Sequence, residues 1–482
     1  MATYNMKSLK AEEFINHQEI LDTIAYAEEH KHDVELIDSI LQKARPDNIS
    51  VDNHCAALTH REAAVLLACD IPEKVQEIMT LAEEIKQRFY GNRIVMFAPL
   101  YLSNYCVNGC VYCPYHLKNK CIARKKLTQE EVRAEVIALQ DMGHKRLAIE
   151  AGEDPKHNPI EYILECIDTI YSVNHKNGAI RRVNVNIAAT TVENYRKLKN
   201  AGIGTYILFQ ETYHKESYLE LHPTGPKHDY DYHTEAMDRA MEGGIDDVGL
   251  GVLFGLQNYL YEFIGLMMHA EHLEAVHGVG PHTISVPRLK PANDINPDDF
   301  ENALPDDIFE KIIACIRVAV PYTGMIISTR ESADMRARAL RLGISQISGA
   351  SRTSVGGYTE EERPHDSEQF DVSDQRTLDE VVRWLMEMGH IPSFCTACYR
   401  EGRTGDRFMS LCKTGQILNC CHPNAVMTLT EFLVDYASDE TKEIGFKMVE
   451  QELEKIPNEK ARALAREHVE EIKASNRRDF RF

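Results

Sequence analysis

Short apolar runs and longer amphipathic segments alternate through the middle of the chain. Eight runs, rich in β-branched residues, have the length of buried strands: Arg93–Leu100, Arg146–Glu150, Val183–Ala188, Thr205–Gln210, Val248–Leu256, Thr283–Pro287, Met325–Thr329 and Ser345–Gly349. Between them lie segments with apolar residues at helical spacing, such as Thr128–Met142, Val192–Ala201, His233–Gly243 and Asp307–Val320. A strand followed by a helix, repeated, predicts parallel βαβ units. Eight units predict an α/β fold of the (β/α)8 barrel type, with an open doubly wound sheet as the alternative.

The two ends of the chain have a different pattern. The first 92 residues are helical in pattern, and Thr59-His60-Arg61-Glu62 has the form of a capping box. A charged, loop-rich stretch follows residue 355, and helical patterns then return at Leu378–Met388, Leu429–Tyr436 and Lys442–Lys455. We therefore expect a helical N-terminal extension over 1–92, a barrel over 93–355 and a mainly helical C-terminal domain over 356–482. For the extension we expect a covering or dimer-contact role.

Composition and charge narrow the class of protein. The chain has 482 residues, of which 43% are hydrophobic and 27% charged, which excludes collagen-like, coiled-coil and disordered classes. Its net charge of −21 argues against nucleic acid or an anionic membrane as a partner. No apolar run approaches the length of a membrane span, and the N-terminus lacks the charged-then-apolar pattern of a signal peptide. We expect a cytoplasmic protein.

Most of the thirteen cysteines fall into two groups. In the cytoplasm, clustered thiols indicate metal binding rather than disulfides. The first group is Cys106, Cys110, Cys113 and Cys121, and the second is Cys395, Cys398, Cys412, Cys420 and Cys421. The remaining cysteines lie in apolar surroundings and are expected to be packing residues: Cys55, Cys69, Cys166 and Cys315.

The first group has the spacing Cys106-x3-Cys110-x2-Cys113 and directly follows the first predicted strand. Three thiolates can bind one [4Fe–4S] cube and leave its fourth iron open for another ligand. A zinc site completed by Cys121 or His116 is the alternative. The loop lies where a barrel holds its active site, which favours the iron–sulfur cluster.

This loop resembles the signature of the radical S-adenosylmethionine (SAM) enzymes. The resemblance implies that the open iron binds SAM and that an electron from the cluster cleaves SAM to a 5′-deoxyadenosyl radical. The superfamily has a Gly-Gly-Glu-like motif at the end of strand two, and this chain has Glu150-Ala151-Gly152-Glu153, which departs at the first Gly. By this resemblance Tyr112, Gly152 and Glu153 are expected to contact the bound cofactor.

Polar residues also follow several other predicted strands. Because the carboxyl ends of barrel strands meet at one face, we expect these side chains to form a polar ligand pocket. We assign Asn186, Gln210 and Glu211 to cofactor binding, and Ser328 and Arg330 to the catalytic pocket. Arg330 suits a substrate carboxylate because its guanidinium binds two oxygens at once.

The second group has the spacing Cys395-x2-Cys398-x22-Cys421. This spacing fits a second iron–sulfur cluster with one open iron, and it fits equally a zinc site completed by Cys412, Cys420 or His422. A radical SAM barrel with this C-terminal motif resembles the HydG family, the tyrosine lyases that mature [FeFe]-hydrogenase. The related ThiH lyases of thiamine synthesis lack the motif.

The resemblance to the HydG family implies a specific reaction. L-tyrosine would be cleaved at its Cα–Cβ bond to p-cresol and dehydroglycine, and dehydroglycine would become CO and cyanide at the auxiliary cluster. The product would be an iron–CO–cyanide synthon for the hydrogenase H-cluster. The family holds an extra (dangler) iron through a cysteine-derived ligand and a histidine, for which we favour His272, with His282 second.

The same resemblance implies a set of partners: L-tyrosine, free cysteine, a reductant such as ferredoxin or flavodoxin, and other hydrogenase maturation proteins. Two alternatives stay open at this point. One is a ThiH-like 2-iminoacetate synthase with zinc in its C-terminal domain. The other is a non-catalytic iron–sulfur carrier, which would not need the polar strand ends.

Overall fold

The structure is a computed structural model that describes residues 2–48, 58–360, 367–414 and 416–482. Cys55 therefore lies outside the described residues, whereas Cys69, Cys166 and Cys315 are buried, as expected of packing residues.

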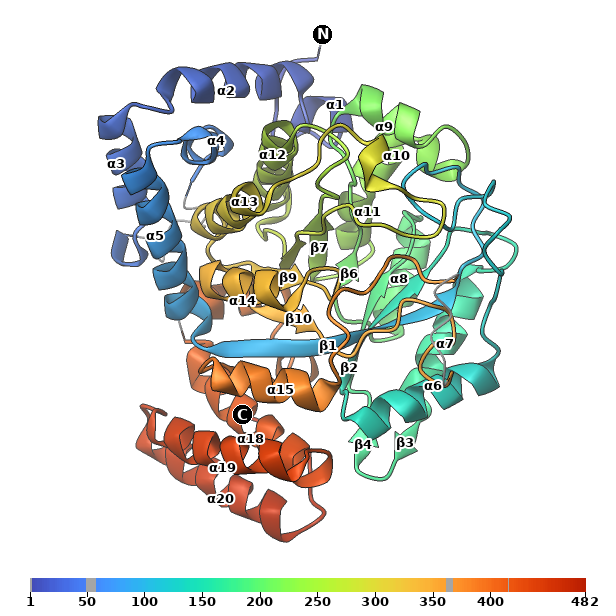
Figure 1. Cartoon of the computed structure of the whole chain (residues 1–482), viewed down its shortest axis with the longest axis vertical. Coiled ribbons are helices and arrows are strands. Elements are labelled where there is room, and N and C mark those ends of the chain that lie inside the picture. The colour runs from blue at the N-terminus through green and yellow to red at the C-terminus, as the bar shows by residue number, and fades with distance from the viewer. Residues whose placement is uncertain (1, 49–57, 361–366, 415) are drawn as a thin grey trace.

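Eight parallel strands close into a barrel at the centre of the molecule (Figure 1). The strands are β1 (Arg93–Ser103), β2 (Arg146–Ala151), β5 (Arg182–Asn186), β6 (Tyr206–Ile207), β7 (Val248–Gly251), β8 (Thr283–Ser285), β9 (Gly324–Ile327) and β10 (Gln346–Ser348). Each pairs with the next, and β10 pairs with β1, with Met96 opposite Ile347. This pairing closes the sheet, so the predicted (β/α)8 barrel is confirmed and the open sheet is excluded.

Helices surround the barrel and connect its strands. They are α6 (Gln129–Met142), α7 (Ile160–Ser172), α8 (Val192–Asn200), α9 (Lys215–Leu221), α10 (Tyr230–Thr234), α11 (Ala236–Glu242), α12 (Tyr259–His277), α13 (Asp306–Ala319) and α14 (Ala333–Leu342). The connections also contain the short 3₁₀ turns η2 (Pro226–His228) and η3 (Pro297–Asp299) and a hairpin of β3 (Asn174–His175) and β4 (Gly178–Ala179). The predicted helix His233–Gly243 is divided between α10 and α11. Thr234 donates its hydroxyl to the carbonyl of Tyr230, a local bond that competes with helix continuation.

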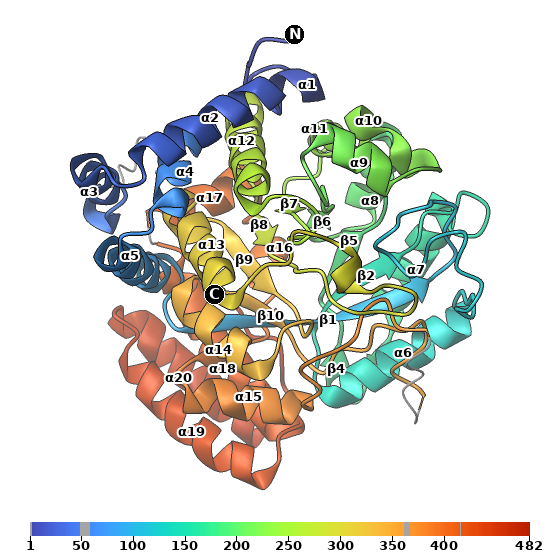
Figure 2. The ribbon, with the colours of Figure 1, turned by 45° about the horizontal axis from the view of Figure 1, so that its top comes forward.

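The N-terminal helices pack against α12 and α13 on one side of the barrel (Figures 1 and 2). They are α1 (Ala11–Phe14), α2 (His17–His30), α3 (Val34–Lys43), η1 (Pro46–Asn48), α4 (His60–Ala68) and α5 (Pro72–Tyr90). The capping box that begins α4 at Thr59 is present. His60 lies between two carboxylates, 3.0 Å from Glu19 and 2.8 Å from Glu271 of α12. The extension is thus held to the barrel by polar as well as apolar contacts.

The C-terminal part adds one strand and a set of helices. The elements are α15 (Leu378–Glu387), β11 (Ile391–Ser393), α16 (Ala397–Arg400), α17 (Gly405–Lys413), α18 (Leu418–Asp435), α19 (Asp439–Glu454) and α20 (Glu459–Ala474). β11 pairs in parallel with the beginning of β1, with Ile391 opposite Arg93. This strand has only three residues, one of them Pro392, which is too short a pattern to predict. It carries Cys395 to the end of the barrel where the strands begin. None of the described helices is long and apolar enough to span a bilayer.

Candidate active site and a second cysteine-lined cavity

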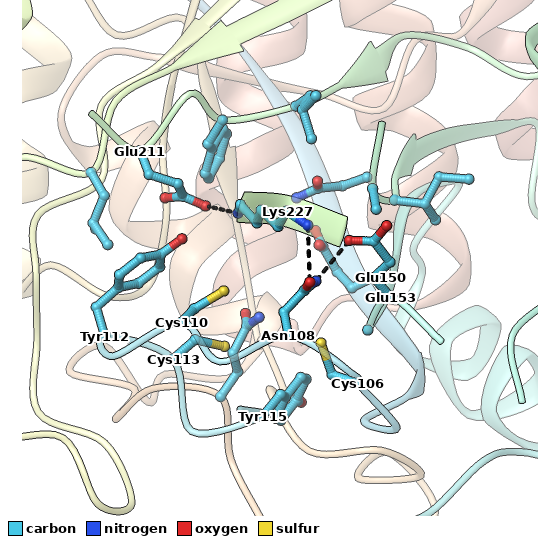
Figure 3. A pocket seen from close by; sticks show the side chains of 18 of the residues that line it. Cys106, Asn108, Cys110, Tyr112, Cys113, Tyr115, Glu150, Glu153, Glu211 and Lys227 are labelled. Carbon is cyan, nitrogen blue, oxygen red and sulfur yellow. Dashed lines mark hydrogen bonds and ion pairs between the residues drawn. The ribbon is translucent and has the colours of Figure 1, made fainter. Parts of the chain in front are cut away.

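The first cysteine loop lines a cavity at the carboxyl ends of the barrel strands (Figure 3). The loop follows β1, and its three thiols face residues from the ends of β2, β5 and β6. The lining includes Cys106, Cys110, Tyr112, Cys113, Glu150, Gly152, Glu153, Asn186, Glu211, Lys227 and Arg330. We call this space the first cavity.

Close contact between the cysteine loop and the end of β2 fixes the loop. The backbone N–H of Val107 donates to the carbonyl of Glu153 at 2.8 Å. A Cβ added at Gly152 would lie 2.4 Å from the carbonyl oxygen of Tyr105, so only glycine permits this approach. The departure from the family motif at Ala151 leaves this second Gly in place.

A series of three polar contacts connects the loop to the far wall of the first cavity (Figure 3). Asn108 donates to Glu153 at 2.7 Å, its oxygen accepts from the backbone N–H of Lys227 at 3.0 Å, and Lys227 pairs with Glu211 at 2.8 Å. Glu211 adopts a left-handed backbone with φ of 67°, a strained conformation that often occurs at functional sites. Sequence reasoning missed Asn108 and Lys227, because an Asn between cysteines and a Lys in a loop carry no signal of their own.

The electrostatics of the thiols suit a site completed by metal. Burial raises the pKa of Cys110 to about 12, although Lys227 lowers it, and desolvation likewise raises the pKa of Cys106 and Cys113. Thiols in such surroundings stay protonated until a metal displaces the proton. Three sulfur donors around one cavity are therefore a donor set that fits a [4Fe–4S] cube.

A second space, the inner pocket, continues from the first cavity into the barrel. Glu150, Asn186 and Arg330 line both spaces. The other walls of the inner pocket combine aromatic and small polar side chains: Phe97, Tyr101, Phe209, Ser285, Ser328, Thr329, Ser348, Ser351, Gln369 and Phe370. The pocket is thus an apolar slot with charged groups at the end that faces the cysteines.

Arg330 and Glu150 are the charged groups of the inner pocket. The Arg330 guanidinium lies 3.9 Å from the ring centre of Phe370. Its Nε is buried and has no hydrogen-bond partner among the described residues. Desolvation raises the pKa of Glu150 well above its usual range, despite the opposing effects of Arg330 and Asn186. A buried guanidinium with free donors is a suitable partner for a carboxylate.

The structure brings together most residues selected from the sequence. Tyr112, Gly152, Glu153, Asn186 and Glu211 line the first cavity, and Ser328 lines the inner pocket. Gln210 lines neither and instead donates to Thr234 at 2.9 Å. The side chain of Gln210 is directed to α10, because successive residues of a strand point to opposite faces.

The C-terminal cysteines line a separate cavity, the second cavity, at the opposite end of the barrel. Cys395, Cys398, Cys412 and Cys421 are all in its wall. Four strands contribute to both linings, and on each strand the residue of the second cavity lies two positions before that of the inner pocket. The pairs are Val95 and Phe97, Arg146 and Ala148, Gly324 and Ile326, and Gln346 and Ser348. Residues two apart on a strand share a face and lie about 7 Å apart. Consecutive layers of inward-facing side chains therefore line the inner pocket and the second cavity.

The two candidate histidines lie in different places. His282 lines the second cavity, with its Nδ1 3.2 Å from Asp247 and its ring against Phe408. His272 lies on α12 outside that lining, stacked on Phe14, and its two ring nitrogens bond the carbonyl of Met6 and the carboxylate of Asp238. Of the two histidines, His282 and not His272 therefore lies in the described lining beside the C-terminal cysteines. A helical periodicity cannot show that a histidine is already engaged by another segment.

A closed parallel barrel with a three-cysteine loop after its first strand is the architecture of a radical SAM enzyme, and comparisons with known proteins agree. The profile of the Radical SAM superfamily matches residues 100–269, and that of the Biotin and Thiamin Synthesis associated domain matches residues 285–391. Such a fold and family imply a [4Fe–4S] cluster and SAM.

Among solved structures, the chain is similar to a crystal structure of HydG, a maturase of the [FeFe]-hydrogenase, with 54% identity, a TM-score of 0.92 and coverage of 97% of this chain and all of that one. HydG from Carboxydothermus hydrogenoformans is 38% identical, with a TM-score of 0.81 and coverage of 95% and 99%. The 2-iminoacetate synthase of Salmonella typhimurium is 29% identical over 70% of this chain and 87% of the relative. The chain belongs to the HydG family of radical SAM proteins.

Proposed function

We propose that the protein is a tyrosine lyase that supplies iron-bound CO and cyanide for the H-cluster of [FeFe]-hydrogenase. One observation supports this most directly: the barrel has a cavity at each end. Three cysteines of the family motif line one cavity, and the C-terminal cysteines line the other. Cleavage of tyrosine is assigned to the first cavity and the inner pocket. Formation of CO and cyanide is assigned to the second cavity.

Cys106, Cys110 and Cys113 would hold the SAM-binding [4Fe–4S] cluster, which supplies the electron for cleavage of SAM. Glu153, one oxygen of which accepts a hydrogen bond from Asn108, would accept a hydrogen bond from the SAM ammonium. The Lys227–Glu211 pair forms the opposite wall. We propose Tyr112 and Asn186 as further SAM contacts, because both line the same cavity.

The inner pocket would hold L-tyrosine beside SAM. Arg330 would bind the substrate carboxylate, and Ser328 and Glu150 would orient the amino group from which hydrogen is abstracted. Phe97, Phe209 and Phe370 would pack against the phenol ring. This orientation places the amino end of tyrosine nearest the first cavity, because Glu150 and Arg330 are shared by both spaces.

Cys395, Cys398 and Cys421 would hold the auxiliary iron–sulfur cluster, with His282 as the ligand of an extra iron that also carries free cysteine. Because consecutive layers of side chains line the inner pocket and the second cavity, the barrel interior would be the short route for dehydroglycine. We further propose a ferredoxin or flavodoxin as reductant and other hydrogenase maturation proteins as acceptors of the product.

An anaerobic analysis tests this proposal. Reconstituted protein should bind about eight irons per chain, as two cubes require. Incubation with SAM, tyrosine and a reductant should yield 5′-deoxyadenosine and p-cresol. Replacement of Cys106, Cys110 and Cys113 together by Ala should abolish both products and leave the iron of the second cavity in place. A triple variant that still makes 5′-deoxyadenosine would show that the first loop is misassigned.

The similarity to 2-iminoacetate synthases favours a second candidate, a lyase that releases dehydroglycine without making CO or cyanide. It shares the tyrosine cleavage and differs in the use of the C-terminal cysteines. Roughly four irons with one zinc per chain, and p-cresol without iron-bound CO, would select this candidate.

A further inference from the structure

Three neighbouring barrel strands begin with a buried arginine. Arg93 is the first residue of β1, Arg146 of β2 and Arg182 of β5, and they are 7%, 7% and 4% exposed. Arg146 and Arg182 are opposite each other in the parallel register. All three line the second cavity. The N-terminal end of a barrel usually serves stability, and like charges side by side destabilise a sheet, so this arrangement calls for a compensating anion.

Among the described residues, only one of the three guanidinium groups has a carboxylate within 4.0 Å. Arg182 donates to Asn184 at 3.0 Å and to Thr205 at 2.8 Å, and lies 4.0 Å from Asp247. Arg146 donates to the backbone carbonyl of Cys395 at 2.7 Å, and its Nε has no partner. Arg93 has a buried Nε without a partner and no ion pair within the part of the chain that the structure describes.

The other charges of the second cavity do not remove this excess. Asp247 lies 4.0 Å from Arg182 and 3.2 Å from His282, so among the described ion pairs it serves Arg182 alone of the three arginines. Three thiolates would balance the three guanidinium groups, but the iron–sulfur core they hold is itself cationic. A second cavity with its cluster therefore has positive charge left for one further anion.

We propose that Arg93, Arg146 and Arg182 form a carboxylate-binding site that holds the two-carbon product of tyrosine cleavage beside the C-terminal cysteines. This inference rests on the proposed function. The arginine fork binds both oxygens of a carboxylate, and Arg93 and Arg146 have the free donors. Free cysteine also has a carboxylate, so the test compares the two sources.

The probe is glyoxylate, a stable two-carbon carboxylate of nearly the shape of dehydroglycine. It is titrated by calorimetry into the reconstituted protein with saturating L-tyrosine, which occupies the inner pocket and Arg330. Arg93→Gln removes one fork, and Arg88→Gln is the matched control, since Arg88 is exposed on the adjacent helix α5. Iron and sulfide analysis checks that each variant is loaded equally.

We expect wild type and Arg88→Gln to bind glyoxylate alike and Arg93→Gln to bind it at least about tenfold more weakly, the loss typical of a charged hydrogen-bonded contact. Arg93→Gln should still form p-cresol at the wild-type rate but release more glyoxylate and less cyanide. If Arg93→Gln fails to load iron, Arg93→Lys replaces it, because it keeps the charge and loses the fork.

Three outcomes overturn the inference: no glyoxylate binding by wild type, equal affinity in a loaded Arg93 variant, or dependence on Arg93 for L-cysteine alone. The last would assign the carboxylate to cysteine. Absence of p-cresol from wild type would instead contradict the proposed function, and the titration would still report on the arginines.

Discussion

At the scale of single residues, the first cavity and the inner pocket depend on a few positions where the surroundings permit little change. At Arg330, the Nε is buried without a hydrogen bond in the described structure, Nη1 donates to the carbonyl of Arg288 at 3.4 Å, and the guanidinium face covers Phe370. Gly152 is another such position, because the cysteine loop passes within contact distance of its Cα. Both positions permit a sharp test.

Arg330→Lys keeps the positive charge but loses the planar fork and the stacking on Phe370. We expect the dissociation constant of L-tyrosine to rise about tenfold or more, since a charged hydrogen bond contributes about 1.5–3 kcal/mol. SAM binding, measured in parallel by calorimetry, should change little. An unchanged affinity for tyrosine would place the carboxylate elsewhere, with Arg352 the next candidate.

Gly152→Ala introduces a Cβ that would lie 2.4 Å from the carbonyl oxygen of Tyr105. The backbone must shift to relieve this contact, at a cost of about 1–3 kcal/mol. We expect SAM cleavage to fall at least tenfold and iron at the first site to decrease, with iron at the second site retained. Full SAM cleavage by this variant would show that the loop tolerates displacement from β2.

At the scale of elements, short or irregular segments position the functional groups. β11 has three residues, yet its pairing with β1 brings the C-terminal cysteines to the beginning of the barrel strands. The N-terminal helices are fixed to α12 by His60, which contacts Glu271, and by the stack of Phe14 on His272. Contacts of this kind make the extension sensitive to pH.

His60 is the titratable group from which we expect this pH dependence of stability. Burial would lower the pKa of His60, but the carboxylates of Glu271 and Glu19 outweigh it and raise the pKa above its ordinary value. A raised folded-state pKa contributes stability that is complete below the unfolded value near 6.5 and is lost as pH rises through the folded value. We expect thermal unfolding of wild type to shift to lower temperature as pH rises above about 6.5.

His60→Gln removes the titrating group and is the control for this pH dependence. Its unfolding temperature should be lower at pH 6 and change less between pH 6 and pH 9 than that of wild type. A wild-type slope that persists in His60→Gln would assign the effect to another group.

At the scale of the whole molecule, two cysteine-lined cavities share one barrel. The inner pocket and the second cavity use residues two positions apart on the same strands, so neighbouring layers of side chains line them. The helices α18–α20 pack together below α15 in the view of Figure 1. The two halves of the proposed reaction should therefore be separable by substitution.

Cys395→Ser with Cys398→Ser replaces two soft thiolates by hydroxyls and should empty the second cavity of its cluster. Chromatography should show p-cresol at the normal rate, and infrared spectra should show no iron-bound CO or cyanide. Iron-bound ligands at the normal rate would make the second group structural and remove the main support for the proposed function.

A matched pair of histidine variants tests the extra iron. His282→Ala should lose the extra iron and most of the iron-bound CO while the rest of the iron stays, because His282 lines the second cavity. His272→Ala should leave the iron content unchanged. It should lower the free energy of unfolding by up to about 5 kcal/mol, because it removes one partner of a buried pair with Asp238. The reverse pattern would restore His272 as the ligand.

The sequence by itself determined the barrel, the first cysteine loop and most of its surroundings. Strand and helix periodicities are local, and a Cys-x3-Cys-x2-Cys spacing constrains three ligands within eight residues, so both can be read without a structure. The capping box at Thr59 was equally legible and is present. Asn186, Glu211 and Arg330 were found because strand ends of a barrel must meet.

Only the tertiary structure decided what depends on contacts between distant segments. It directed Gln210 to Thr234, paired His272 with Asp238 and the backbone of Met6, and placed His282 beside the C-terminal cysteines. It also brought Lys227 to Glu211 and gathered Arg93, Arg146 and Arg182 around one cavity. A side chain's partners are set by the packing of segments far apart in sequence, and no local pattern encodes that packing.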